Sequence, residues 1–359
     1  SPLMPGVLMI EALTQVAAVL LLDRAEAPAT ARVWLRGVDN AKFRRQVVPG
    51  DCLRLEVRLG RIRSRLARAR ASAFVEDQPV AEADLLLAIE PGAAYIHPTA
   101  VVDPAARVGA GTTVGPYCTI GPEVVIGQRC QIGASVVIDG WTEIGDDTRV
   151  YPMASIGLAP QDLKYKGERT RLAIGRENTF REFVTINRGT LGGGGHTTIG
   201  NGNLFMAYVH VAHDCHIGDS TIFGNGATLG GHVTVEDWAT VSAYSGVHPF
   251  CRVGRHAYVG GYSVVTKDAL PFGKSVGNRA RIYGLNTIGL ERRGFTADTI
   301  NQLKRAYRYL LQSKLNTSRA LLQIEQDAKL TSPEVRCLVD FIRSSKRGGI
   351  LRRPTRRVE

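Results

Sequence analysis

Residues 108–133, VGAGTTVGPYCTIGPEVVIGQRCQIG, carry an aliphatic residue at every sixth position, and each of these is followed by glycine. The same period holds without a break from Ile96 to Ile156. After two interruptions it resumes one residue out of phase at Ile199 and continues to Val265. A hexapeptide period is typical of a parallel β-helix, in which about three hexapeptides form one coil. We therefore predict a left-handed parallel β-helix with the aliphatic residues pointing into its interior.

The two interruptions are predicted to be loops that project from the β-helix. The first is GLAPQDLKYKGERTRLA at 157–173, and the second is NRGTLGGGGHTT at 187–198. Because functional residues are often found on loops held by a rigid scaffold, both loops are candidates for the functional site.

The chain changes character on both sides of the repeat. After it, 294–312 and 332–345 have helical spacing, with Thr296 and Ser332 as N-caps and Pro333 at a first helical position. Before it, an apolar helix is followed by strand-like runs, which indicates an α+β domain. The fold class is therefore mainly β, and we expect three domains, at 1–92, 93–270 and 271–359.

The overall composition restricts the kinds of partner and the cellular compartment that we expect for the protein. The net charge is +12 over 359 residues, with a basic C-terminal end at 344–359, which suits an acidic partner. The six cysteines contain no CxxC pair, which argues against a zinc finger and for reduced thiols in a cytoplasmic protein. The apolar run at 7–22 contains Glu11 and is expected to be too short for stable membrane insertion. Because the chain begins with Ser1 and not Met, we expect it to be a fragment.

The histidines in 207–235, AYVHVAHDCHIGDSTIFGNGATLGGHVTV, are the main candidates for chemistry. Residues 18 apart stack about 4.8 Å from one another on neighbouring coils. Gly231 should then lie over His213 and His232 over Asp214, with His248 on the next coil. None of these positions belongs to the inward aliphatic set, so we expect the five residues to cluster along one edge of the β-helix.

Two functional interpretations of this cluster remain open on the residues alone. In the first, histidines on neighbouring coils bind zinc, which needs three protein ligands and an open position. In the second, which the pattern favours, His213 is a general base oriented by Asp214, and the Gly231 N–H stabilises a developing oxyanion. His97, His216 and His256 are interpreted as surface or corner residues.

Several motifs closely resemble the UDP-N-acetylglucosamine acyltransferase family of lipid A biosynthesis. They are PQDLKY, VTINRGT, HVAHDC, GGHVTV, VHPFCRVG and GLERRGF, and they extend from about Ile96 to the last helix. The resemblance implies a homotrimer that moves an (R)-3-hydroxyacyl chain from acyl carrier protein to the 3-hydroxyl of UDP-N-acetylglucosamine. It also implies that neither a metal nor a cofactor is used, and it gives no indication of nucleic-acid binding.

The same resemblance implies roles for individual residues. His213 matches the catalytic base, Asp214 its orienting carboxylate and Gly231 the oxyanion donor. Gly261 matches the position that measures acyl length. The positions that match other substrate contacts are Asp162, Lys164, His210, His232, His248, Asn286, Arg292 and Arg293. Pro249, Arg279 and Ile288 depart from the family pattern, so a 3-amino analogue of the UDP-sugar stays open as the acceptor, as does the acyl chain length.

Residues 1–90 resemble the second half of a 3-hydroxyacyl-carrier-protein dehydratase, a hot-dog fold. PLMPGVLMIEALTQ matches its central helix and RRQVVPGD a strand and turn. Glu11 matches the catalytic acid and Gln15 its helical neighbour. The partner histidine would fall three positions before Ser1, so we expect this remnant to be inactive and the natural polypeptide to be longer and bifunctional.

Three alternatives to the O-acyltransferase are kept. A sugar N-acyltransferase would share the fold. A β-helical zinc lyase similar to carbonic anhydrase would use the histidines as ligands. A non-catalytic scaffold for carrier protein would use only the basic helical region.

Overall fold

The computed structural model describes residues 2–25, 31–63, 65–313 and 315–345. The chain divides into two compact units, Ser1–Tyr95 and Ile96–Glu359. The basic segment expected to meet an acidic partner lies mostly outside the described residues, from 346 onward. The separate domain expected over 271–359 stays a prediction, because these residues share one compact unit with the β-helix.

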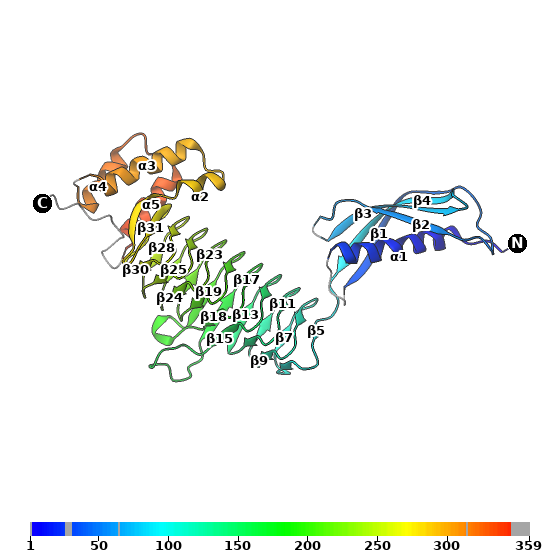
Figure 1. The fold of residues 1–359 in the computed structure, drawn as a ribbon, viewed down its shortest axis with the longest axis horizontal. Helices are drawn as coiled ribbons and strands as arrows, with labels where there is room; N and C mark the ends of the chain where they lie inside the picture. The colour runs from blue at the N-terminus through cyan, green and yellow to red at the C-terminus, as the bar shows by residue number, and fades with distance from the viewer. Residues whose placement is uncertain (1, 26–30, 64, 314, 346–359) are drawn as a thin grey trace. The chain divides into compact units, whose positions relative to one another are not determined.

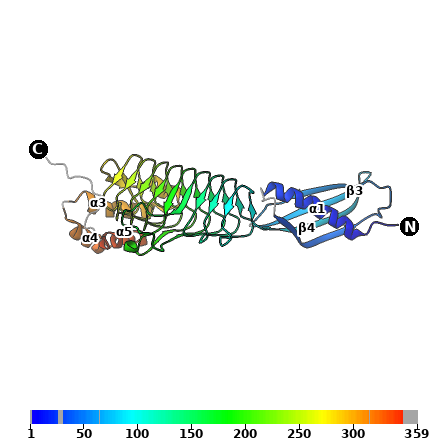
Figure 2. The same cartoon turned by 90° about the horizontal axis from the view of Figure 1, so that it is seen from below.

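The N-terminal unit is one helix packed on an antiparallel sheet, in agreement with the predicted α+β domain. The sheet has the order β1-β4-β3-β2, and α1 lies along it (Figures 1 and 2). Small side chains at alternate positions of β3 and β4 let the helix approach closely, and alanines at 67, 69, 71 and 73 are fully or almost fully buried. The elements are α1 (Gly6–Arg24), β1 (Arg32–Phe43), β2 (Arg54–Leu59), β3 (Leu66–Val75) and β4 (Gln78–Glu90).

Helix α1 is longer than the apolar run at 7–22 and is buried on one face only. It has 19 residues, and by length and composition alone it is long enough and apolar enough to cross a membrane. The argument that the run is too short to span a bilayer was therefore wrong. Only one face is buried against the sheet, at Met9, Leu13, Thr14, Ala17 and Leu21. The other face exposes Val7 and Val19.

The second unit is a β-helix made of three parallel sheets, as the hexapeptide period predicted (Figure 1). The eight-stranded sheet contains β7 (Arg107–Val108), β10 (Val125–Ile126), β13 (Trp141–Ile144), β16 (Arg171–Ile174), β19 (His196–Ile199), β22 (His216–Ile217), β25 (Thr234–Val235) and β28 (Arg252–Val253). The nine-stranded sheet contains β6 (Val101–Val102), β9 (Thr119–Ile120), β12 (Val137–Ile138), β15 (Ser155–Leu158), β18 (Thr185–Asn187), β21 (His210–Val211), β24 (Thr228–Leu229), β27 (Gly246–Val247) and β30 (Val264–Val265). The eleven-stranded sheet contains β5 (Tyr95–Ile96), β8 (Thr113–Val114), β11 (Gln131–Ile132), β14 (Arg149–Val150), β17 (Thr179–Phe180), β20 (Leu204–Phe205), β23 (Ile222–Phe223), β26 (Thr240–Val241), β29 (Tyr258–Val259), β31 (Gly273–Val276) and the antiparallel β32 (Arg281–Leu285).

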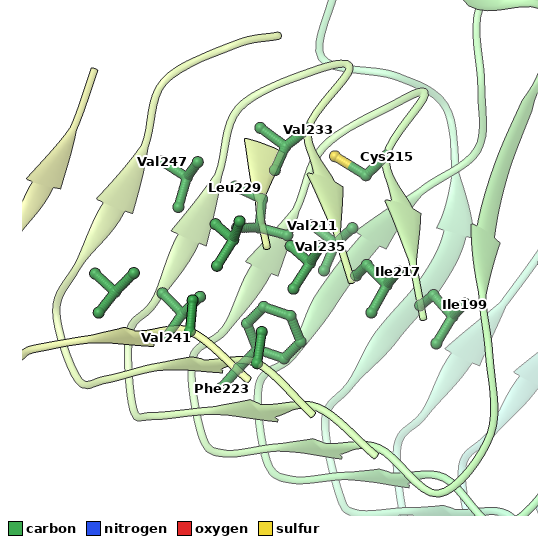
Figure 3. Close-up of a cluster of buried hydrophobic side chains, with 14 of the residues drawn as sticks. Ile199, Val211, Cys215, Ile217, Phe223, Leu229, Val233, Val235, Val241 and Val247 are labelled. Atoms are coloured by element: carbon green, nitrogen blue, oxygen red, sulfur yellow. The ribbon is translucent and has the colours of Figure 1, made fainter. Parts of the chain in front are cut away.

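Register confirms the stacking rule used on the sequence. Ile126 pairs with Ile144 on the next coil, and Ile199 pairs with Ile217, both 18 residues on. Aliphatic residues at the repeat positions fill the interior, and Figure 3 shows Ile217, Phe223 and Leu229 among the buried side chains of this core. The inward direction predicted for them is therefore confirmed from Val114 to Val265, whereas Ile96 on the first coil is exposed.

The two interruptions are loops, as predicted. Loop 1 joins β15 to β16 and loop 2 joins β18 to β19, and both project from the coils (Figure 1). Between them a complete coil continues the ladder, since Ile144 pairs with Ile174 and Ile174 with Ile199. The sequence repeat changes phase because these loops add residues between strands, and the β-helix itself is not broken.

Phe180, Phe205 and Phe223 form a stack inside the β-helix, with ring centroids 4.8 Å apart at both steps. Phe205, in the middle, is fully buried. We expect Phe205→Ala to lower the free energy of unfolding by about 3–5 kcal/mol, because it removes apolar contacts and leaves a cavity. Urea unfolding checks this, with Tyr117→Ala as the control. Tyr117 is 69% exposed, so its replacement should cost only about 0.5 kcal/mol. Equal losses in both variants would contradict the prediction.

Helices close the C-terminal part of this unit. The elements are α2 (Thr287–Arg292), α3 (Ala297–Leu311), α4 (Thr317–Gln326) and α5 (Pro333–Arg343). Both predicted caps are present, since Thr296 accepts from the Thr299 N–H and Ser332 from the Val335 N–H. The side chain of Arg252 donates to the carbonyl oxygen of Phe341 and thereby ties α5 to the β-helix.

Candidate active site

His213 and Asp214 lie at the corner between β21 and β22, where the chain leaves the nine-stranded sheet for the eight-stranded one. Nδ1 of His213 is 2.7 Å from Oδ2 of Asp214. The same carboxylate accepts the backbone N–H of Thr190 at 2.8 Å and the Thr190 hydroxyl at 2.6 Å. Asp214 is 1% exposed, so these three donors satisfy an acceptor that has almost no access to water.

This arrangement determines which nitrogen of His213 is free. A carboxylate can only accept hydrogen bonds, so the imidazole must donate its Nδ1 proton to Asp214. The lone pair of neutral His213 is then on Nε2. The side chain of His213 is 16% exposed, so Nε2 can be reached by a substrate from outside. The geometry is that of a base whose tautomer is determined by a buried carboxylate.

Loop 2 buries Asp214, which the period alone could not predict. The stacking rule places Asp214 outside the core, and its backbone has a positive φ of 59° as expected at a corner. A Cβ added at Gly193 would collide with the carboxylate, so loop 2 needs glycine there. Thr190 of the same loop supplies two donors, and neither residue was among the predicted site residues. The only feature of the sequence that indicated these two residues was the break in the hexapeptide period at 187–198.

Gly231 lies over the ring of His213, as the stacking rule predicted. A Cβ at this position would be 2.6 Å from Cε1 of His213, so any larger residue would displace the imidazole. In the part of the chain that the structure describes, the backbone N–H of Gly231 has no hydrogen-bond acceptor. A buried, unused N–H next to a base is suited to stabilising negative charge on a reacting oxygen.

His232 lies on the same side of the corner. Its backbone N–H donates to the carbonyl oxygen of His213 at 3.0 Å, and the two rings meet edge to face with centroids 5.2 Å apart. Phe250 stacks on its other face at 4.2 Å. Burial lowers the pKa of His232, against the opposing effect of nearby carboxylates that include Asp162.

His210 and Lys164 are two further positions that match substrate contacts. Nδ1 of His210 is 2.7 Å from the hydroxyl of Thr185, and burial lowers the pKa of His210. In loop 1 the backbone N–H of Lys164 donates to Asp162 at 3.0 Å, and the Lys164 side chain is exposed. His210 therefore lies beside the corner, whereas the structure places Lys164 only on the exposed part of loop 1.

His248 and Gly261 lie on later coils than the dyad. His248 follows β27, whose Val247 pairs with Leu229, so its backbone stacks above Gly230 at the edge that the spacing predicted. Its side chain is exposed, and its Nδ1 is 3.2 Å from the carbonyl oxygen of Pro249. Gly261 is also exposed, at a different corner, between β29 and β30.

A second site-forming feature is a pocket of about 640 Å³ over the eleven-stranded sheet. It contains Asn286, Arg292 and Arg293, three of the positions that match substrate contacts in the family. The rest of its lining comes from β23, β26, β29, β31, the end of β32 and the start of α2. The three residues therefore lie together, and the role that the resemblance implies for them stays a prediction.

His256 differs from its interpretation as a surface or corner residue. It does lie at a corner, with a φ of 55°, but it is only 8% exposed. Its ring is stacked between Trp238 and Phe272, and Nδ1 is 3.0 Å from Nη1 of Arg293. Burial, with smaller contributions from nearby arginines, lowers its pKa from 6.5 to about 4.

The lowered pKa of His256 predicts a loss of stability in mild acid. Below pH 6.5 the unfolded chain binds a proton at this residue that the folded chain does not bind until about pH 4, so stability falls as the pH falls through this window. Between pH 7 and pH 5 the loss from this residue should be about 2 kcal/mol. Urea unfolding at both pH values should show a smaller loss for His256→Phe than for the unmodified chain. Identical losses would contradict the assignment.

The comparisons with known proteins cover both units. Residues 268–351 match the family model described as UDP N-acetylglucosamine O-acyltransferase, domain 2. Residues 196–231 match the model for the bacterial transferase hexapeptide, and residues 1–84 match a FabA-like domain.

Whole proteins match over the second unit. The acyl-[acyl-carrier-protein]–UDP-N-acetylglucosamine O-acyltransferase of Stenotrophomonas maltophilia is 49% identical over 254 residues, which cover 70% of this chain and 96% of the relative. The protein of the same name from Burkholderia lata is 48% identical over 256 residues, which cover 70% of this chain and 98% of the relative. The crystal structure of the Francisella novicida UDP-N-acetylglucosamine acyltransferase is 39% identical, with a TM-score of 0.70, and covers 72% of this chain and 95% of its own. With nearly the whole length of these relatives covered at such identity, the chain belongs to the acyl-[acyl-carrier-protein]–UDP-N-acetylglucosamine O-acyltransferase family.

Proposed function

We propose that the second unit transfers an (R)-3-hydroxyacyl chain from acyl carrier protein to the 3-hydroxyl of UDP-N-acetylglucosamine, the first step of lipid A biosynthesis. The observation that carries the proposal is the dyad of His213 and Asp214 beside the unused N–H of Gly231. The names of the relatives specify the same donor and acceptor classes.

The proposed mechanism uses this geometry directly. Nε2 of His213 takes the proton of the sugar hydroxyl while the oxygen attacks the thioester carbonyl carbon. The carbonyl oxygen becomes an oxyanion, which the Gly231 N–H stabilises. When the tetrahedral intermediate collapses, the carbon–sulfur bond breaks and the sulfur leaves with the proton held by His213. Asp214 accepts the hydrogen bond from Nδ1 of His213 throughout and stabilises the imidazolium.

We propose that the substrate contacts are shared between copies of a homotrimer. The base lies at the corner between the nine- and eight-stranded sheets, and this corner does not border the eleven-stranded sheet. The pocket with Asn286, Arg292 and Arg293 lies over the eleven-stranded sheet. A neighbouring copy would bring the second feature to the first, and it would also cover the exposed Leu163 of loop 1.

The assay that tests the proposal combines the protein with 3-hydroxyacyl-carrier protein and UDP-N-acetylglucosamine. We propose that the reaction takes place in the cytoplasm, where both substrates are expected. Formation of the acylated UDP-sugar supports it. Transfer only to the 3-amino analogue of the UDP-sugar would replace it by the N-acyltransferase alternative. A protein that binds carrier protein without turnover would be the scaffold.

The zinc lyase is favoured by one observation. Ligand atoms of His213, Asp214 and His232 lie within 4.8 Å of one another. However, the Asp214 carboxylate already accepts from His213 and from two donors of Thr190, which leaves it poorly placed to coordinate a metal as well. Metal analysis of the purified protein, together with hydration of carbon dioxide, separates this alternative from acyl transfer.

For the first unit we propose a dehydratase remnant that is inactive by itself. Glu11 is exposed on α1 and accepts from Gln15 at 3.1 Å. Residues 1–95 contain no histidine, so the acid lacks the partner that dehydration needs. An enoyl-formation assay on 3-hydroxyacyl-carrier protein should show no product, and measurable dehydration would contradict the proposal.

A further inference from the structure

We infer that His256 is a positioning residue for the pocket over the eleven-stranded sheet, where its ring orients Arg293 and its carbonyl oxygen orients Asn286 toward a nucleoside diphosphate. This inference rests on the proposed function, which identifies the acceptor as a UDP-sugar and therefore the ligand of the pocket as a nucleoside diphosphate. The family resemblance assigned no role to His256.

The ring of His256 is held in place by aromatic neighbours. Trp238 stacks on one face at 6.1 Å and Phe272 on the other at 5.7 Å, and both lie close to parallel to it. Phe295 meets it edge to face at 4.9 Å. Tilting the imidazole would therefore displace three packed rings, so the core determines the plane of the ring, and the hydrogen bond with Arg293 determines that Nδ1 is on that edge.

Nδ1 of His256 points at Arg293. A guanidinium can only donate, so at 3.0 Å the imidazole must accept from Nη1, and its own proton is on Nε2. The same Nη1 donates to the carbonyl oxygen of Trp238 at 2.7 Å, and the guanidinium lies over the Trp238 ring at 5.2 Å. In the described residues Nε and Nη2 of Arg293 have no hydrogen-bond partner. One nitrogen holds the group in place while the others are available to oxygen atoms of a ligand.

The backbone of His256 acts on the other side of the pocket. Nδ2 of Asn286 donates to the His256 carbonyl oxygen at 3.2 Å. The Asn286 amide also packs closely against Gly289, where an added Cβ would lie only 2.7 Å from its Oδ1. The backbone of Gly289 therefore limits the movement of the Asn286 side chain as well. Two pocket residues that are separated along the chain are thus aligned by one residue of the β-helix.

An acceptor beside a guanidinium must be uncharged. The lowered pKa of His256, at about 4, keeps the ring neutral at the pH of an ordinary assay. A protonated imidazole would repel Arg293 and could not accept from it. Burial, the largest cause of this pKa, is a consequence of the same aromatic packing.

The test compares two replacements of His256. Phenylalanine preserves the stacked ring and removes the acceptor, and the chain already has phenylalanine at corner positions with positive φ at Phe250 and Phe272. Asparagine places an amide oxygen near the position of Nδ1 and also tolerates positive φ. Thermal unfolding monitors the fold of both variants.

Calorimetric binding of UDP alone is the main readout. We expect His256→Phe to weaken UDP binding about ten-fold, since a hydrogen bond to a charged group is lost, and His256→Asn to restore most of it. In an Arg293→Met background, His256→Phe should weaken UDP binding by less than about two-fold. In turnover, KM for the UDP-sugar should rise about ten-fold with kcat nearly unchanged.

Each outcome decides the inference. Wild-type affinity of His256→Phe for UDP would overturn it, as would an equal loss in the Arg293→Met background, which would indicate a purely structural role. If the unmodified protein binds UDP but does not transfer acyl groups, the proposed function fails while the binding data still decide the role of His256.

Discussion

Replacing His213 by alanine is expected to lower kcat/KM for acyl transfer to UDP-N-acetylglucosamine by about 10²- to 10⁴-fold, the range that a positioned general base contributes. The hydroxyl group of the sugar is a poor nucleophile unless a base removes its proton as it attacks. Nε2 of His213 is the nitrogen left free by the hydrogen bond to Asp214, so the variant has no replacement at this position. Steady-state assays over a range of both substrates measure the effect.

His216 provides a matched control three residues away. It lies on β22, on the adjacent sheet, and its Nδ1 is 2.9 Å from the hydroxyl of Thr198. His216→Ala removes an imidazole of similar burial from the same coil and should leave kcat/KM within about two-fold of the unmodified enzyme. Full activity in His213→Ala, with a normal melting temperature, would refute the mechanism. Equal losses in both variants would point to a structural cause.

Much of the site could be predicted from the sequence because a β-helix converts sequence distance into spatial distance. Eighteen residues make one coil, so Gly231 had to lie over His213, and His232 over Asp214. The ring of His213 indeed touches the position where a Gly231 Cβ would be, and the two backbones are joined by the His232 N–H. The period could be used in this way only where no loop intervenes.

The remainder of the site depends on segments without a period. Thr190 and Gly193 reach Asp214 because loop 2 folds back over the corner, and a loop of this kind has no register that the sequence displays. His248 shows what spacing alone leaves open. Stacking placed its backbone one coil above Gly230, but the direction of its side chain, toward the carbonyl oxygen of Pro249, did not follow from spacing.

His256 lies at a corner, as one part of its interpretation expected, but it is not at the surface, and the sequence held a signal for its stacking. Trp238 lies 18 residues before it, at the same corner of the preceding coil, so an aromatic stack could have been expected. What could not be expected is its burial, which comes from Phe295 and Arg293 of the segment that follows the β-helix. The same limit applies to α1, because its apolar composition does not show that the sheet covers only one face of the helix.

Replacing Asp214 by asparagine is expected to lower kcat/KM by a similar factor, about 10²- to 10⁴-fold, while preserving the shape of the site. The amide oxygen can still accept the Thr190 N–H. The amide nitrogen would then face the Thr190 hydroxyl and Nδ1 of His213, and as a donor it would require Nδ1 to accept. The imidazole proton would move to Nε2, the atom that must take the proton of the substrate. The base would be present in the wrong tautomer.

Asp219→Asn is the control for this change. Asp219 is an exposed corner carboxylate on the same coil, and it accepts the Asn201 N–H at 2.6 Å without touching His213. It should retain activity within about two-fold. Melting temperatures of both variants are needed, because Asp214 is buried and loss of its hydrogen bonds could loosen loop 2. A folded Asp214→Asn protein with more than about half of normal kcat/KM would show that the carboxylate does not determine the tautomer of His213, and the base would then have to be oriented by another group.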